Sequence, residues 1–212
     1  MKNKQYKVGI IGCGAILVRH IEAINKNDNF SLVSLCDVDA ARYPADLLPK
    51  EKFYVDYKEM ITKEDINFVV VATPNNLHYE QSIYALQNGC DILVEKPATL
   101  NSKLLEKIQK TADENNQKAY CVLQVRLNPT VQMVKGLLDT GQLGEIRGIS
   151  LIQRWQRPPE YFEGWRGVPE EGGGILHECG IHYLDIMGYL FGEPEICYSK
   201  HYNTKHKNTP IE

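Results

Sequence analysis

The sequence predicts an α/β fold, in which a doubly wound parallel sheet is followed by an incomplete α+β open-sheet domain. Strand-like and helix-like segments alternate through the first half of the chain, as in a parallel sheet with helical crossovers. Residues 68–72 form a continuous apolar run rich in β-branched residues, which is typical of a strand covered on both faces. The alternation ends after Arg126. We therefore expect one domain at 1–120 and a second at 121–212.

Six strands and the helices between them make up the expected first domain. We expect strands at 6–11, 32–36, 53–55, 68–72, 92–94 and 119–125. We expect helices at 15–26 and 77–88, a helical stretch after Asp39 and a helix that begins after Asn101. Gly89 marks the end of one helix, and the Asn101 side chain caps the start of another.

The sequence after Arg126 has a different character. We expect a helix from about Pro129 to Gly141, a long strand at 146–155, an Arg-, Pro-, Trp- and Gly-rich loop at 156–174, a helix at 175–191 and at most one more strand at 196–202. The helix at 175–191 is apolar almost all round, so we expect it to be largely buried.

Composition excludes several classes of protein. The 212 residues include 43% hydrophobic residues, enough for a substantial core, and the formal net charge of -3 does not suit a nucleic-acid binder. No apolar run approaches the ~20 residues that span a bilayer, and the polar start lacks a signal peptide. The six cysteines show no Cys-x-x-Cys spacing. We expect a cytoplasmic protein with reduced thiols and no metal site, nucleic-acid partner or membrane contact.

Gly12-Cys13-Gly14 lies where the first expected strand passes into the first helix. Glycines at this point let the backbone approach a pyrophosphate, and the helix N-terminus supplies N–H donors, although an ordinary turn has the same sequence. Asp37, at the end of the second strand, adds a carboxylate that accepts from ribose hydroxyls and repels a 2′-phosphate. Together they predict a Rossmann domain that binds NAD, with Leu17 departing from the Gly or Ala of the usual fingerprint.

Two polar segments follow later strands at the same carboxyl edge of the sheet, where open α/β sheets bind ligands. Thr73-Pro74-Asn75 follows one strand and is also consistent with a proline turn whose Asn75 caps a helix. Glu95-Lys96-Pro97 follows the next and brings an acid and an ammonium to the edge. A cis bond before Pro97 would fix the direction of Lys96, although a lysine at a strand end is as often solvated surface.

Three polar residues lie on one face of the helix at 175–191. Glu178, His182 and Asp185 are spaced by four and three residues, so they share a face and need partners or a ligand. A histidine that an acid orients can act as a general base, although a single histidine in a core helix is more often structural. The other histidines near this end of the chain, His177, His201 and His206, we expect at the surface.

Arginines and aromatic residues alternate around the expected loop. The set is Arg126, Arg154, Arg157 and Arg166 with Trp155, Tyr161 and Trp165. A guanidinium fork suits a phosphate or carboxylate, so these arginines could hold an anionic substrate. A solvated loop fastened by aromatic rings is an equally good interpretation.

Taken together, these motifs resemble the glucose-fructose oxidoreductase/inositol dehydrogenase (Gfo/Idh/MocA) family. The matching segments are Gly12–Gly14, Ala72–His78, Glu95–Pro97, and Gly172–Gly174 running on to Gly180-Ile181-His182 and Asp185. The segments at 122–126 and 165–167 look like the bacterial branch that oxidises C3 of UDP-N-acetylglucosaminuronic acid for surface-polysaccharide synthesis.

The resemblance implies roles for individual residues. Lys96 would polarise the reacting hydroxyl and stabilise the developing alkoxide, while His182 takes its proton and hydride passes to nicotinamide. Asp185 would orient the helix or the imidazole. Glu178 stands where the family more often has Asp, or Asn in the sugar-nucleotide branch.

The complete set of expected contacts follows from the motifs and the resemblance. The expected catalytic residues are Lys96, His182 and Asp185. The expected cofactor contacts are Gly12, Cys13, Gly14, Ala15, Ile16, Asp37, Thr73, Pro74, Asn75, His78, Glu95, Lys96 and Gln124. The expected substrate contacts are Lys96, Arg126, Asn128, Arg166, Glu178 and His182.

Members of this family usually continue for another hundred or more residues, which complete an open sheet that backs the substrate site. We therefore expect 121–212 to be a partial substrate and oligomerisation domain with an exposed sheet edge, and the chain to form a homo-oligomer. The expected function is NAD-dependent oxidation of a secondary hydroxyl of a sugar nucleotide. The alternatives are a dehydrogenase of a free sugar or polyol such as inositol, and an NAD-binding protein without turnover.

Overall fold

The computed structural model describes residues 4–46, 49, 52–195, 198–200 and 202. The chain divides into two compact units, Met1–Val122 and Leu123–Glu212. Each unit is described by itself.

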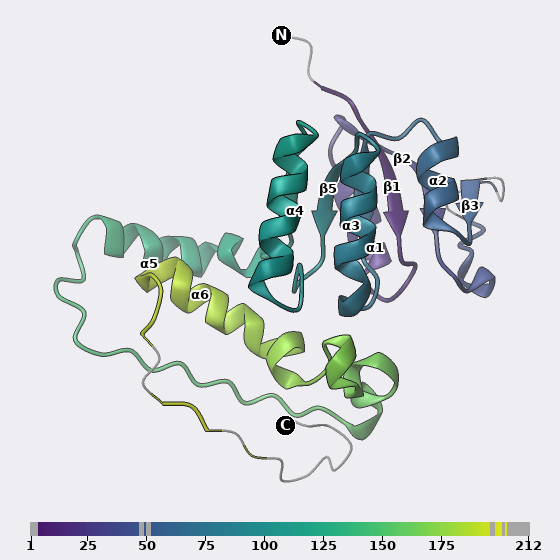
Figure 1. Ribbon diagram of the computed structural model, residues 1–212. Coiled ribbons are helices and arrows are strands. Elements are labelled where there is room, and N and C mark those ends of the chain that lie inside the picture. The colour runs from purple at the N-terminus through teal and green to yellow at the C-terminus, as the bar shows by residue number, and fades with distance from the viewer. Residues whose placement is uncertain (1–3, 47–48, 50–51, 196–197, 201, 203–212) are drawn as a thin grey trace. The chain divides into compact units, whose positions relative to one another are not determined.

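A six-stranded sheet forms the centre of the first unit (Figure 1). Its strands are β1 (Tyr6–Ile11), β2 (Phe30–Cys36), β3 (Phe53–Tyr54), β4 (Phe68–Val71), β5 (Asp91–Val94) and β6 (Ala119–Cys121). All neighbouring strands pair in parallel, in the order β3-β2-β1-β4-β5-β6. The order reverses between β1 and β4, so the crevice at their carboxyl ends is where such sheets bind ligands. The predicted doubly wound α/β sheet is confirmed.

Helices cover both faces of this sheet. α1 (Leu17–Asn25) packs on one face with Val8, Ile10 and Val70. On the other face, α2 (Tyr57–Lys63), α3 (His78–Gln87) and α4 (Ser102–Glu114) pack against Ile11, Val71 and their neighbours; Figure 1 shows these three helices in front of the sheet. Successive residues of a strand point to opposite faces, so both faces of β1 and β4 are apolar.

Several elements differ from the sequence-based expectations in the first unit. The prediction missed α2, a seven-residue helix whose start is capped by the Asp56 side chain, which accepts from the Lys58 N–H. Only two of its residues, Met60 and Ile61, are buried, so it carries little apolar periodicity. The predicted last strand is too long, because the chain leaves the sheet after Cys121 and forms a 3₁₀ turn at Gln124–Leu127.

The second unit is built on two helices. α5 (Pro129–Asp139) begins at a proline in its first turn, and the Asn128 side chain accepts from the Thr130 N–H. The predicted helix at 175–191 has two parts, a π-helical turn at Leu176–Gly180 and α6 (Ile181–Phe191). The two helices pack on each other, with Gln132 of α5 donating to the Tyr189 hydroxyl at 3.1 Å.

The long strand predicted at 146–155 is wrong. The backbone there has no paired strand among the described residues of this unit, and a strand without a ladder is not stable. Its apolar side chains are exposed, Ile152 to 72%. Residues 198–200 and 202 are not strand either, while 196, 197 and 201 of that predicted strand lie outside the described residues.

The prediction that the helix at 175–191 is largely buried is also wrong. Leu184 of α6 is 65% exposed and Leu176 is exposed as well, whereas Ile186 is the buried residue of α6. An apolar helix stays exposed where no neighbouring layer covers it, and the described part of the second unit supplies only α5, the 3₁₀ turn at Gln124–Leu127 and the loop before Gly172.

Candidate functional site

The two glycines of the turn after β1, Gly12 and Gly14, lie in different surroundings. Gly12 has a φ of 101°, and a Cβ there would lie 2.4 Å from the Ala72 carbonyl oxygen, so β1 and β4 can approach only with glycine at this position. Gly14 has no such conflict, since the nearest atom to its Cβ position is Nη1 of Arg42 at 3.9 Å. This open space lies before the start of α1, at a helix N-terminus that suits a pyrophosphate.

Asp37 lies at the end of β2, as predicted, and is buried. Its Oδ2 accepts from the Cys13 N–H at 2.8 Å and its Oδ1 accepts from the Asp39 N–H at 3.0 Å. Asp37 therefore also fixes the glycine turn. Burial, reinforced by the Asp37 charge, raises the pKa of the Cys13 thiol to about 12, so Cys13 offers a protonated side chain.

Arg42 is a residue that the sequence-based prediction missed at this edge. It lies in the 3₁₀ turn Ala40–Arg42, and its guanidinium is 3.6 Å from both Asp37 Oδ2 and Asp39 Oδ2. Its place five residues after the acid of the fingerprint was the available signal.

His78 is fully buried at the start of α3. Its Nδ1 is 2.8 Å from the Pro97 carbonyl oxygen and its Nε2 is 2.8 Å from the Thr73 carbonyl oxygen. Burial lowers the pKa of His78 despite these oxygens, which raise it. His78 therefore holds the loops after β4 and β5 together, and the predicted direct cofactor contact does not suit a side chain with no exposed surface. The Thr73 hydroxyl donates to Gln81 at 2.6 Å, and Asn75 is buried in the same loop.

The Glu95-Lys96-Pro97 segment follows β5, and the Lys96–Pro97 bond is cis. Glu95 is largely buried and its Oε1 lies 2.9 Å from Nε2 of His20, a residue of α1. Burial alone would raise the pKa of Glu95, but the His20 hydrogen bond and charge, with the Lys96 N–H and charge, hold the pKa below its ordinary value. The carboxylate beside Lys96 is therefore ionised at neutral pH. Sequence reasoning missed His20, which reads as an ordinary helix residue.

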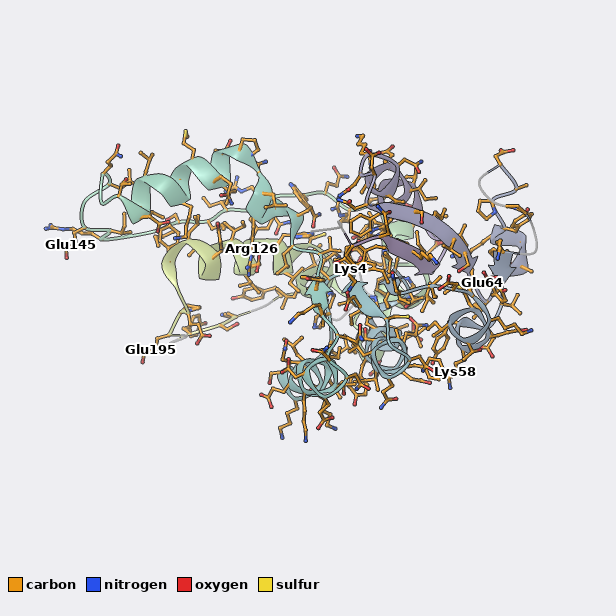
Figure 2. All side chains as sticks on the ribbon, turned by 90° about the horizontal axis from the view of Figure 1, so that it is seen from above. Lys4, Lys58, Glu64, Arg126, Glu145 and Glu195 are labelled. Carbon is orange, nitrogen blue, oxygen red and sulfur yellow. The ribbon has the colours of Figure 1, made fainter. Side chains whose placement is uncertain are left out.

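The second unit holds the helical acids in ion pairs. Glu178, in the π-helical turn, is buried; its Oε2 accepts from Arg166 Nε at 3.2 Å and from the Tyr161 hydroxyl at 3.4 Å. Asp185 of α6 accepts from Arg126 Nε at 2.9 Å and also from Arg126 Nη2. Figure 2 shows the labelled Arg126 between α5 and α6. The predicted substrate residues Arg126 and Arg166 are thus paired with carboxylates of their own unit.

His182 lies in the first turn of α6, and its Nδ1 is buried. The π-helical turn that precedes it shifts the phase of the helix between Glu178 and His182. Such turns inside helices are frequent at functional sites.

Asn128 and Gln124, also predicted as site residues, lie near the start of α5. Asn128 uses its side-chain oxygen as the cap of α5, and Gln124 lies in the 3₁₀ turn before it.

Aromatic rings hold the arginines of the loop. The Arg157 guanidinium lies 4.7 Å from the centre of the Tyr161 ring, and Arg157 Nη2 is 3.3 Å from the buried Cys179 Sγ. Arg166 lies over the Trp165 ring at 4.9 Å. A Cβ on Gly173 would lie 2.4 Å from the Arg166 carbonyl oxygen, so the glycines let this loop pack closely on the start of the helix.

The structure therefore gathers two sets of predicted residues. The carboxyl edge of the sheet brings together the glycine turn, Asp37, the loop after β4 and Lys96, and the second unit brings together Glu178, Arg166, Asp185 and Arg126. Contact between Lys96 and His182 would join the two units and stays a prediction.

Among the described residues, no cluster of three metal-ligating side chains occurs, and no described helix has the length and apolar character needed to cross a membrane.

This sheet edge has the architecture of a dinucleotide-binding domain. Residues 6–123 match the model of an oxidoreductase family with an NAD-binding Rossmann fold, and residues 131–212 match the GFO/IDH/MocA C-terminal domain. The chain belongs to the Gfo/Idh/MocA family, as its motifs predicted, and its first unit is an NAD-binding Rossmann domain. The cradle fits NAD, because Gly14 leaves open space at the helix start and Asp37 stands at the end of β2.

Known proteins resemble the chain over most of its length. It is 28% identical to an uncharacterized oxidoreductase of Streptococcus pneumoniae, over 88% of this chain and 50% of that protein, and 26% identical to the D-glucoside 3-dehydrogenase of Escherichia coli, over 92% and 57%. The WlbA dehydrogenase from Bordetella pertussis, solved with NADH and UDP-GlcNAcA, superposes with a TM-score of 0.85 at 30% identity, over 91% of this chain and 57% of that one. The myo-inositol 2-dehydrogenase from Lactobacillus plantarum superposes at 0.73 with 26% identity, over 89% and 57%. The chain thus spans about half to three fifths of these proteins.

Proposed function

We propose that the chain carries the NAD site and the catalytic residues of a dehydrogenase that oxidises a secondary hydroxyl of a sugar nucleotide. The observation that supports this most directly is the Glu95-Lys96-Pro97 segment at the same sheet edge as the glycine turn, in a chain similar to WlbA. WlbA was solved with UDP-GlcNAcA, so we propose C3 of a UDP-N-acetylglucosaminuronate-like substrate, in surface-polysaccharide synthesis. We also propose a cytoplasmic homo-oligomer.

The proposed chemistry assigns one task to each residue. NAD, when bound by the glycine turn and Asp37, supplies the hydride acceptor. The Lys96 ammonium donates a hydrogen bond to the reacting hydroxyl and stabilises the negative charge that develops on its oxygen. His182 takes the hydroxyl proton on Nε2, because its Nδ1 is buried. Asp185 anchors α6 through Arg126 and so fixes where His182 is presented.

One observation favours a second candidate substrate. The Glu178 carboxylate neutralises Arg166 within the second unit, so this arginine meets an internal acid rather than a substrate carboxylate. A neutral sugar or polyol needs no such arginine, and an inositol dehydrogenase is among the similar structures. A dehydrogenase of a free sugar or polyol is therefore the alternative.

A panel assay separates these candidates. The purified chain is mixed with NAD and, in turn, UDP-GlcNAcA, UDP-GlcNAc, myo-inositol and a glucoside, while NADH absorbance is followed and NAD binding is measured by calorimetry. Turnover of UDP-GlcNAcA alone supports the first proposal, and turnover of the neutral substrates supports the second. NAD binding with no turnover on any of them would identify an NAD-binding protein without activity.

A further inference from the structure

A buried histidine and carboxylate join the helix after the glycine turn to the strand end that carries Lys96. His20 lies in the first turn of α1 and is 8% exposed, and its Nε2 is 2.9 Å from Glu95 Oε1. The two side chains are 75 residues apart in the sequence. Their contact bridges the elements that follow β1 and β5.

The other oxygen of Glu95 is directed to the lysine. Glu95 Oε2 accepts from the Lys96 backbone N–H at 3.3 Å. The carboxylate is thus held at both oxygens, by α1 on one side and by the Lys96 peptide on the other. Because a buried carboxylate keeps its charge only with such partners, loss of either one would free it to turn elsewhere.

The position of His20 in its helix argues for a role beyond packing. The other buried residues of α1 are Leu17, Ile21 and Ile24, which pack on the sheet, so His20 is a polar residue on an otherwise apolar face. A leucine there would bury more apolar surface and would need no partner. What the histidine adds is a fixed hydrogen bond to the residue before Lys96.

We propose that His20 is a positioning residue for Lys96: it holds Glu95, and through Glu95 the Lys96 backbone, at a fixed distance from the helix that follows the dinucleotide turn. Any movement of α1, which follows the glycine turn, is then shared by the Lys96 backbone. The His20 bond also fixes the direction of one oxygen of the Glu95 carboxylate. This inference rests on the proposed role of Lys96 in the reaction.

The test measures Lys96 directly, without depending on turnover. Wild type, His20→Leu and His20→Gln are acetylated with limiting acetic anhydride, and the modification at Lys96 is followed by peptide mass spectrometry. In His20→Leu the released carboxylate pairs more closely with the ammonium and makes the amine less available to the reagent, so acetylation slows about tenfold. In His20→Gln an amide N–H replaces the imidazole donor, and the rate stays close to that of wild type.

Three further variants make the test decisive. Adding Glu95→Gln to His20→Leu removes the released charge, so the Lys96 rate should recover. Arg19→Leu removes an exposed charge from the same helix without touching Glu95, and should leave the rate unchanged. His20→Asn, too short to reach Glu95, replaces His20→Leu if the latter does not fold, as judged by circular dichroism.

The possible outcomes distinguish this inference from the proposed function. A folded His20→Leu or His20→Asn protein with wild-type labelling of Lys96 would overturn the positioning role, whatever the activity. If the protein turns over a substrate, the same variants should lose kcat while the affinity for NAD stays near that of wild type. Labelling changes without turnover in any variant would uphold the His20 inference and refute the dehydrogenase.

Discussion

The two units of the chain hold their polar groups in different ways. In the first unit, Asp37, His78 and Glu95 lie at the edge of a sheet with a continuous core on both faces. Each bonds to at least one backbone group, and Glu95 has the His20 side chain as a second partner. In the second unit, Glu178 and Asp185 are held by arginine side chains, and few apolar residues are buried. Backbone partners are fixed by the fold itself, whereas side-chain partners can exchange. We therefore expect the first unit to tolerate little change and the second to be adjustable.

The largest expected effect is that of Gly12→Ala. The new Cβ would lie 2.4 Å from the Ala72 carbonyl at a φ of 101°, so strand spacing and backbone conformation both oppose it. We expect a loss of about 3 kcal/mol in the free energy of unfolding, measured by urea denaturation. Gly14→Ala is the matched control, with a loss below about 0.5 kcal/mol but weaker NAD binding. Equal losses in the two variants would show that the approach of β1 to β4 is not the constraint.

Asp185→Asn should loosen the second unit alone. It removes the charge that Arg126 meets between α5 and α6, and because Arg126 is partly exposed we expect a cost of only about 1 kcal/mol. Hydrogen exchange should become faster in α5 and α6 while the sheet keeps its protection. Faster exchange throughout β1 and β4 would mean that the units do not respond separately.

Glu178→Asn should change substrate preference and leave the first unit intact. It removes the carboxylate that neutralises Arg166 and frees the guanidinium for an acidic ligand. We expect UDP-GlcNAcA to gain about tenfold in affinity over UDP-GlcNAc, measured by calorimetry in the presence of NAD. Glu171→Asn, a nearby acid outside the buried part of this cluster, serves as the control. An unchanged ratio of affinities would show that Arg166 does not face the substrate.

The smallest expected effect is a pH dependence that belongs to the first unit. The folded-state pKa of His78 lies below its ordinary value of 6.5, so its contribution to stability is complete above about pH 6.5 and is lost as pH falls below it. The free energy of unfolding should therefore decline between about pH 7 and about pH 5.5, and decline less in His78→Gln. His177→Gln, in the second unit, is the control. An identical decline in both variants would assign the effect to other groups.

The predictability of the fold follows the same division. Strand β4 and the turn at Gly12 could be recognised because apolar runs and glycines act through local geometry that the sequence displays. The segment at 146–155 has the apolar side chains of a strand, yet a strand also needs a hydrogen-bonded neighbour, which local sequence cannot provide. The apolar pattern of residues 175–191 also predicted that Leu184 is buried. It is exposed, because burial depends on which other elements of the fold pack against the helix.

The candidate site shows the same limit at the level of single residues. The positions of Asp37 and Lys96 at the sheet edge followed from strand order and motif. The pairing of His20 with Glu95, of Arg126 with Asp185 and of Arg166 with Glu178 did not, because such contacts join residues 75, 59 and 12 apart in the sequence and depend on side-chain direction. The two ring nitrogens of His78, expected at the cofactor, lie at the Pro97 and Thr73 carbonyl oxygens, a pairing that the sequence did not indicate.

The two glycines of the turn would have different evolutionary fates in a descendant that no longer used a dinucleotide. Gly12 would persist, since the approach of β1 to β4 demands it with or without a ligand, whereas Gly14 would be free to acquire a side chain. Among proteins with this fold, a retained first glycine therefore reports only the close approach of the two strands. The second glycine is the better marker of a site still in use.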